Sequence, residues 1–220
     1  FEFLTQKNEI NEYLFYACKY DYFGIVDYLF NTNKVIFDKD FKFVKIAASK
    51  NNDEILRFLL LKLGNSIKDS CFRGCINLRS FSIPSFIQSI GNYSFCECTE
   101  LMQIVIPSSL KSIGEYSFYE CQKLKEVVIP SSVNSIGKGA FKNCSFLMKI
   151  VIPSSINSIC DETFYGCISV KEIKIPSSIT FIGNEAFRGC SSLMKIEIPS
   201  SVNSIGDNAF SECDSLAQIT

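Results

Sequence analysis

The chain has 220 residues, 47% of them apolar, and its formal net charge at pH 7 is -1. A chain of this length and composition can bury a large core, and its balanced charge excludes a general electrostatic preference for nucleic acid or an acidic membrane. No apolar run of about 18 residues or more is present, and residues 1–10 lack a basic segment followed by an apolar one, so neither a transmembrane helix nor a secretion signal is expected in the visible chain.

Residues 12–30 and 43–61 align with each other at an offset of 30 residues, which pairs Ala17 with Ala47. Each stretch has the apolar spacing of a short helix, a polar turn and a longer amphipathic helix. The pattern resembles the helix pairs of ankyrin repeats, although the TPLH signature is absent and the spacing is shorter than the usual ~33 residues. We therefore expect an ankyrin-like helical segment over residues 1–61.

From about residue 62 onward, the sequence repeats with a period of 23 residues. The repeating unit is LxxIxIPSSVxSIGxxAFxxC, and seven copies fill residues 62–220. The proline column consists of Pro84, Pro107, Pro130, Pro153, Pro176 and Pro199. The phenylalanine column consists of Phe72, Phe95, Phe118, Phe141, Phe164, Phe187 and Phe210. Regular self-similarity of this kind is the signature of a solenoid in which each repeat forms one coil.

Each part of the unit predicts a local structure. Apolar residues two apart in LxxIxIP predict a short strand, which the proline ends because it lacks an amide proton. The SSVxSIG part predicts a turn and a second extended piece, and AFxxC predicts a helical or 3₁₀ turn. Stacking at about 4.8 Å then gives a parallel sheet on one face and columns of identical side chains inside. The glycines expected to need a positive φ are Gly91, Gly114, Gly137, Gly183 and Gly206.

The unit resembles the BspA-like class of leucine-rich repeats, whose consensus is approximately LxxIxIPxSVxxIGxxAFxxCxxL. This resemblance implies an α+β repeat protein, namely a leucine-rich-repeat solenoid with a parallel β-sheet, preceded by the ankyrin-like helical cap. Ankyrin-like segments precede such repeats in protist surface antigens. The expected domains are the helical segment, residues 1–61, and the solenoid, residues 62–220.

The resemblance also implies a function. The family is known for surface antigens and adhesins of mucosal bacteria and parasitic protists, which bind host proteins or other cells. The chain is therefore expected to be a non-enzymatic protein-binding module in cell-surface adhesion or host interaction. An intracellular scaffold for protein–protein interactions is the alternative, favoured by the missing signal and the thiol-rich interior, and a structural spacer is a third interpretation. The compartment, cell surface or cytoplasm, stays open.

The ends of the solenoid are expected to differ. The first repeat has Leu61 in place of proline and Gly64 in place of valine, which is where a cap would cover the open apolar end of the first coil. The sequence ends on Leu216–Thr220, just before the next expected IP, and shows no second cap. We expect both ends to be incomplete, and self-association through the C-terminal coil is a further expectation.

Eleven cysteines would suit a disulfide framework or a zinc site, but the repeat favours another interpretation. Seven of them form one interior column, so they are expected to be reduced and buried as small hydrophobic side chains. The column consists of Cys75, Cys98, Cys121, Cys144, Cys167, Cys190 and Cys213. Cys18, Cys71, Cys96 and Cys160 lie outside it and are the candidates for reactive thiols.

The sequence carries no recognisable catalytic constellation. It has no histidine, which removes the commonest general base and metal ligand, and its glycines do not form a phosphate-binding loop. The paired serines recur in the turns, where their hydroxyls are expected to satisfy backbone groups. No enzyme activity, cofactor or metal is expected. Whether the sequons at Asn92 and Asn143 are used stays open.

The variable positions lie on the outward side of the strands, and an extended protein partner is expected there. Valines and methionines form the centre and charged residues the margin, although a soluble strand surface without a partner would have the same composition. The predicted contact residues are Met102, Val105, Glu126, Val128, Met148, Lys149, Val151, Lys171 and Glu172.

Overall fold

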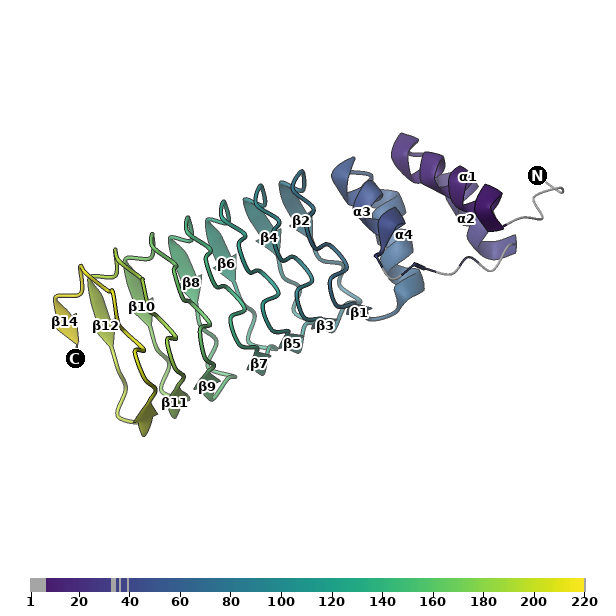
Figure 1. Ribbon diagram of the computed structural model, residues 1–220. Coiled ribbons are helices and arrows are strands. Elements are labelled where there is room, and N and C mark those ends of the chain that lie inside the picture. Colours follow the sequence, from purple (N-terminus) through teal and green to yellow (C-terminus); the bar gives the residue numbers. More distant parts are fainter. Residues whose placement is uncertain (1–6, 33–34, 36, 39, 220) are drawn as a thin grey trace.

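The computed structural model describes residues 7–32, 35, 37–38 and 40–219. Four helices at the N-terminal end precede a long solenoid of flat coils (Figure 1). The helices are α1 (Lys7–Tyr20), α2 (Phe23–Thr32), α3 (Lys42–Ser49) and α4 (Asp53–Leu63).

The two helix pairs bury equivalent positions. Ala17 and Ala47 are both buried, and so are Leu29 and Leu59. The turn within each pair contains one left-handed residue, Asp21 with φ 62° or Asn51 with φ 55°. The expected order of a short and then a longer helix holds for α3 and α4, of 8 and 11 residues, but is wrong for α1 and α2, of 14 and 10 residues. The extra length of α1 lies before residue 12, outside the aligned stretch.

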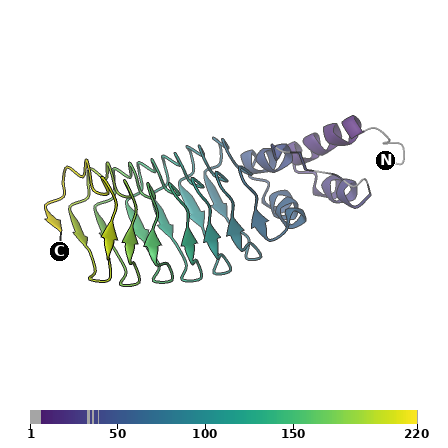
Figure 2. The ribbon, with the colours of Figure 1, turned by 60° about the horizontal axis from the view of Figure 1, so that its bottom comes forward.

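Each coil of the solenoid contributes two short parallel strands (Figure 2). The first series, termed the IxI strands, comprises β2 (Ser80–Ser82), β4 (Gln103–Val105), β6 (Glu126–Val128), β8 (Lys149–Val151), β10 (Glu172–Lys174), β12 (Lys195–Glu197) and β14 (Gln218–Ile219). The second series, termed the SI strands, comprises β1 (Ser66–Ile67), β3 (Ser89–Ile90), β5 (Ser112–Ile113), β7 (Ser135–Ile136), β9 (Ser158–Ile159), β11 (Phe181–Ile182) and β13 (Ser204–Ile205).

Both series pair from coil to coil, and each is interrupted once along the part of the chain that the structure describes. The IxI strands form the sheets β2-β4-β6-β8 and β10-β12-β14, and the SI strands form β1-β3-β5-β7 and β9-β11-β13. The register joins residues one period apart, as in Val127 opposite Ile150. The solenoid therefore has two sheet faces.

The glycines that follow the SI strands do not have a positive φ, so that expectation was wrong. Their role is to let consecutive coils approach. A Cβ atom added to Gly114 would lie 2.6 Å from the carbonyl carbon of Gly91, one coil earlier. The amide of Gly114 also donates to the carbonyl of Ile90 at 2.8 Å, which holds the two coils at this distance.

Left-handed residues occur instead within the turn that follows each glycine. Two columns, four residues apart, have φ between 51° and 72° in every coil. They are Ser70, Tyr93, Tyr116, Gly139, Glu162, Glu185 and Asn208, and Gly74, Glu97, Glu120, Asn143, Gly166, Gly189 and Glu212. A left-handed residue cannot continue a helix, so the AFxxC part forms single turns and not a 3₁₀ helix.

These turns also link the coils. The amides of Phe72 and Gly74 donate to carbonyls of the next coil, those of Ser94 and Cys96, at 2.8 Å. The intervening amide of Arg73 closes a turn onto the carbonyl of Ser70 at 3.0 Å. Alternate amides thus bond between coils and within a coil, and the backbone is satisfied along a third side of the solenoid.

The interior is built from the predicted columns. The phenylalanine rings stack with centroids 4.8 to 5.8 Å apart, and the rings from Phe72 to Phe187 are buried. In the cysteine column each thiol from Cys98 to Cys213 donates to the phenylalanine carbonyl of the preceding coil, as Cys121 Sγ does to Phe95 O at 3.1 Å. The column cysteines therefore satisfy backbone carbonyls as well as filling space.

The helical segment caps the first coil, as the degenerate first repeat predicts. Residues 57–59, one period before β2, lie in α4, so a helix stands where an IxI strand would be. Leu56 and Leu60 of α4 belong to the same buried core as Ile67 and Phe72 of the first coil. Helix α4 extends two residues past the expected limit of the helical domain, and the division into domains stays a prediction.

Candidate functional site

The outer face of the IxI strands is where the sequence places the partner. In each of these strands from β2 to β10, the central residue is buried and the two flanking residues are exposed. Val105, Val128 and Val151 are 50%, 59% and 48% exposed and occupy the same position of successive strands. They form one apolar stripe across β4, β6 and β8, which we call the valine stripe.

Methionines extend the valine stripe on its N-terminal side. Met102 and Met148 are exposed, and Lys125 lies between them one coil from each. The amide of Lys125 donates to Met102 O, and the amide of Met148 to Lys125 O, so the coils are in contact here. A shallow hollow of about 660 Å³ lies over β4 and β6, between Met102 and Val128. The valine stripe is thus continuous and accessible, whereas Lys125 separates the two methionines beside it.

The charged margin forms one cross-strand ion pair. Lys149 Nζ lies 3.0 Å from Glu126 Oε1, and both side chains are more than half exposed. A pair with this exposure contributes at most about 1 kcal/mol to stability. Lys195 pairs with Glu197 of its own strand instead of with its neighbour Glu172. The alternating charges of this column therefore do not form an unbroken ladder among the described residues.

All nine predicted contact residues are exposed, but they do not share one uninterrupted sheet. Seven lie on or just before β4, β6 and β8. Lys171 and Glu172 belong to the coil of β10, and the sheet is interrupted between β8 and β10. The structure brings the nine side chains onto one face without testing whether a partner uses them, so they stay a prediction.

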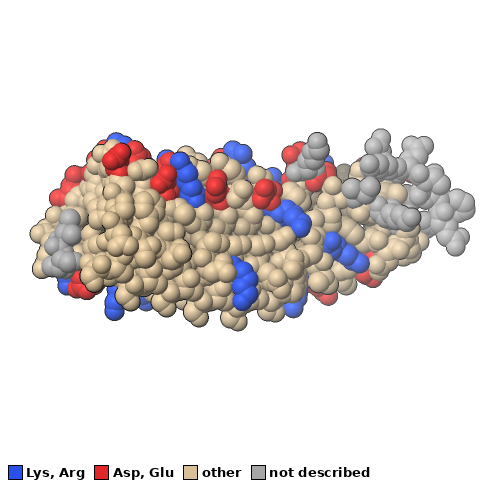
Figure 3. Space-filling model, turned by 90° about the horizontal axis from the view of Figure 1, so that it is seen from below, with Lys and Arg blue, Asp and Glu red and all other residues tan. Residues whose placement is uncertain are grey.

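The face of the SI strands is more uniform. Its outward column consists of Ser66, Ser89, Ser112, Ser135, Ser158, Phe181 and Ser204. Seen from below, charged side chains are sparse over most of this side of the solenoid (Figure 3). The second serine of the SS turn donates to the preceding coil in three turns, those of Ser109, Ser155 and Ser201, as Ser109 Oγ does to Ile87 O at 2.6 Å. The hydroxyls of Ser132 and Ser178, at the same position, have no partner among the described residues. A face with so constant a composition offers few positions that distinguish one partner from another.

Three of the four cysteines that the sequence offers as candidates for reactive thiols are not accessible. Cys18, Cys71 and Cys96 are buried, and burial raises the pKa of each thiol to about 12. Cys71 occupies the small-residue position that Ala140 fills three coils further along the solenoid. Of the eleven cysteines, all of them free, only Cys160 and Cys213 are partly exposed.

Among the residues that the structure describes, no group of three or more histidine, cysteine or carboxylate side chains is arranged to hold a metal ion. No described helix has the length and apolar character needed to span a bilayer. The Asn92 sequon is engaged structurally, because Asn92 Oδ1 accepts the amide of Glu115 at 2.8 Å.

Sequence reasoning missed one further hollow, between α4 and β2. It combines residues of Asn51–Leu60 with residues of Ser80–Ser85, which lie in different elements with no repeat relation. No motif connects the two stretches. Only the docking of the helices onto the solenoid brings them together.

Comparison with known proteins gives matches along the solenoid. A family model described as the BspA type leucine rich repeat region matches in six copies over residues 65–193 and 146–220. The crystal structure of the T. pallidum leucine-rich repeat protein is similar at 30% identity and a TM-score of 0.67, covering 70% of this chain and 72% of that one. No curated protein matches the sequence.

Two further solved structures are similar in sequence, with TM-scores below 0.5. A leucine-rich cell surface protein from Faecalibacterium prausnitzii is 27% identical, with a TM-score of 0.43 and coverage of 69% of this chain and 62% of that chain. A leucine-rich repeat protein from Bacteroides ovatus is 25% identical, with a TM-score of 0.45 and coverage of 70% and 58%. The chain thus spans less than two thirds of these two proteins.

Proposed function

Because this chain belongs to the BspA-type leucine-rich repeat family, we propose that it is a non-enzymatic module that binds another protein along the outer face of the IxI strands. Leucine-rich repeat proteins typically bind proteins. The valine stripe carries the proposal, since its three side chains are each about half exposed on a rigid sheet. Burying the exposed half of each side chain under a partner would contribute about 1 kcal/mol per valine.

The surroundings of the stripe suit an extended partner. The methionines beside it have flexible, polarisable side chains that adapt to the shape of a partner. The Glu126–Lys149 pair and the exposed Lys171 and Glu172 form a charged margin, which would act mainly on the rate and specificity of encounter.

The finer proposal is a role in cell-surface adhesion or host interaction, which rests on the family resemblance. The second candidate, an intracellular scaffold, is favoured by the eleven free thiols, because a reducing compartment preserves such thiols. Labelling intact source cells with a reagent that cannot cross membranes separates the two. A labelled protein supports adhesion, and a protein labelled only after lysis supports the scaffold.

The binding face itself is tested by replacing Val128 and Val151 together with aspartate. The double variant should fold normally, because both side chains point away from the core, and should bind cells or an isolated partner at least about tenfold more weakly. The matched control replaces Asn134 and Asn157, exposed next to the SI strands, with aspartate, which adds the same charge elsewhere. Normal binding by the folded valine variant would place the site on another face.

A further inference from the structure

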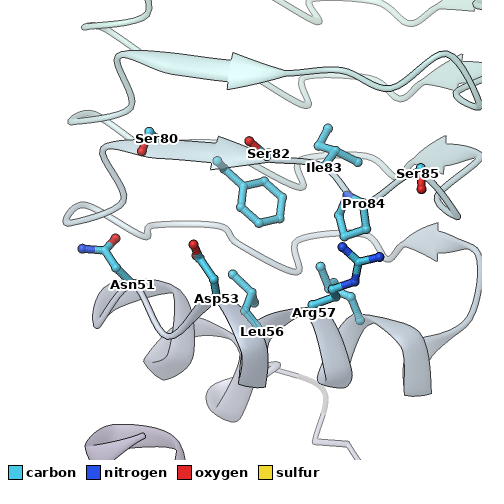
Figure 4. A pocket seen from close by; sticks show the side chains of 11 residues that line it. Asn51, Asp53, Leu56, Arg57, Ser80, Ser82, Ile83, Pro84 and Ser85 are labelled. Atoms are coloured by element: carbon cyan, nitrogen blue, oxygen red, sulfur yellow. The ribbon is translucent and has the colours of Figure 1, made fainter.

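The hollow between α4 and β2 is the place where the helical cap and the first IxI strand meet (Figure 4). Its volume is about 380 Å³. Leu56 and Leu60 of α4 line it and are themselves buried, whereas Asp53 and Arg57, also in α4, are exposed at its rim. The opposite wall is strand β2 with the Ile83–Ser85 segment that follows it.

Among the described residues, strand β2 is an edge strand of its sheet and pairs with β4 alone. The amide of Ile83 donates to Val105 O at 3.0 Å, so the backbone groups of Ile83 and Phe81 face β4. Backbone groups of alternate residues in a strand point to opposite sides. The amides and carbonyls of Ser80 and Ser82 therefore face α4.

Helix α4 covers this edge without pairing with it. The peptide groups of a helix interior are already hydrogen-bonded within the helix, so the interior of α4 has no backbone donors or acceptors to offer a strand. Within the described part of the chain, no partner is found for the backbone groups of Ser80 or Ser82 on this side. The cap shields the apolar core but leaves the polar edge of β2 open toward the hollow.

An open strand edge beside an apolar groove is a site where an extended peptide can add as another strand. The side chains around it specify the peptide. An apolar side chain would lie over Leu56, the less completely buried of the two leucines. Arg57 points toward Pro84, at the C-terminal end of β2, and forms no ion pair with any described residue, so a carboxylate fits there (Figure 4).

We propose that this hollow binds an extended segment of a partner protein, which extends the sheet at β2 and places an apolar residue over Leu56 and a neighbouring acidic residue beside Arg57. The site is separate from the valine stripe and lies where the cap meets the solenoid. Main-chain hydrogen bonds to Ser80 and Ser82 would hold the segment, and the two side-chain contacts would select it.

The probe is the fluorescent peptide Thr-Val-Thr-Val-Glu-Val, with blocked ends, measured by fluorescence anisotropy against the whole chain. If the peptide runs parallel to β2, the amides of its valines face Ser80 and Ser82. If it runs antiparallel, the amides of its threonines and glutamate face them. Methylating the valine amides should abolish binding in the first case, and methylating the remaining amides in the second. Binding that survives both modifications, or no binding at ~1 mM peptide, overturns the proposal.

Two protein variants localise the site. Ser82→Pro removes the amide that faces the hollow and keeps the bonds to β4, since proline is tolerated at a strand edge, and it should weaken binding at least about tenfold. Arg57→Glu should weaken binding of the probe and strengthen binding of a peptide with lysine in place of glutamate. This charge reversal and the methylated peptides decide the question even if Ser82→Pro does not fold.

Other results contradict the proposal. Unchanged affinity in folded Ser82→Pro, or no charge reversal with Arg57→Glu, places the peptide elsewhere. Analytical ultracentrifugation of the chain alone tests whether a second copy of the chain occupies the edge of β2. A dimer that Ser82→Pro dissociates would mean that a second copy of this chain, and not a partner peptide, occupies the edge.

Discussion

A glycine follows five of the seven SI strands, where coils approach closely, and its φ is not in the left-handed region. An added Cβ on Gly114 or Gly137 would lie 2.6 Å from backbone atoms of the preceding coil. The sequence of one repeat does not show how closely the next coil approaches this glycine. The sequence therefore revealed the recurring glycine, but the reason predicted for it, a positive φ, was wrong.

Replacing Gly114 with alanine should lower the free energy of unfolding by about 1–3 kcal/mol, because rigid backbone must move to admit the methyl group. Gly24, in α2, has nothing within 4 Å of its added Cβ and is the matched control. Gly24→Ala should raise stability by about 0.5–1 kcal/mol, because alanine favours the helix. Urea denaturation measures both, and equal effects would contradict the packing explanation.

The thiols respond to pH because of their burial. The pKa of Cys18 and of Cys71 is raised to about 12 by burial, above a reference value of 9.0 that an unfolded chain would show. The folded state thus retains protons that the unfolded state releases above pH 9. Stability from this source is complete below about pH 9 and declines as the pH rises toward 12.

We therefore expect the melting temperature to fall between pH 8.5 and pH 10.5, and the fall to be shallower in Cys71→Ala, since alanine fits the equivalent position in other coils.

In the native state at pH 8, a thiol reagent should modify Cys160 and Cys213 first. In denaturant without reductant it should modify all eleven thiols. Recovery of five or fewer would indicate disulfides instead.

Among the secondary-structure elements, the strands could be predicted from the sequence more readily than the turns. The alternation of LxxIxIP has one physical meaning, a strand with one buried face, and the structure has it in each coil. The left-handed positions could not be found in this way, because side chains as different as Tyr93, Glu162 and Asn208 occupy one of the two columns. Bonds to the next coil hold these residues in a conformation that their own preferences disfavour.

Removing the whole helical segment, residues 1–63, should expose the core side of the first coil and cause aggregation or a loss of thermal stability. Removing residues 1–32 alone should have a smaller effect, because α3 and α4 would still cover Ile67 and Phe72. Light scattering and thermal melting compare the two truncations. A monomeric solenoid of unchanged stability after the larger deletion would show that the helices are an independent module.

At the scale of the whole molecule, the repeat pattern predicted some features of the structure and not others. The periodic columns predicted the solenoid, its buried side and the exposure of all nine contact residues, because each of these depends on position within one repeat. The hollow beside Arg57 and the interruptions of the sheets were not predictable from the unit. They depend on how different elements meet, and on single departures from the consensus such as Cys160.

The interruption of the SI sheet coincides with one such departure. The sheet is broken between β7 and β9, and Cys160 follows β9 where Gly137 and Gly183 stand in neighbouring coils. Gly183 donates its amide to Ile159 O at 2.8 Å, but the described residues include no such bond from Cys160. The rings of Phe141 and Phe164, across the same boundary, are 5.8 Å apart, the widest spacing in their column. The side chain of Cys160 occupies space that the close approach of coils requires.

Cys160→Gly should therefore restore the missing amide bond and raise stability by about 1 kcal/mol. Because coils in a solenoid stabilise their neighbours, the unmodified chain should open first at this boundary, as two blocks with separate free energies of opening. Native-state hydrogen exchange should show amides of the two blocks with different protection, and Cys160→Gly should reduce the difference. Cys160→Ser, which keeps a Cβ, is the matched control and should leave the two blocks distinct. A single uniform protection level in the unmodified chain would show that the interrupted pairing does not weaken the solenoid.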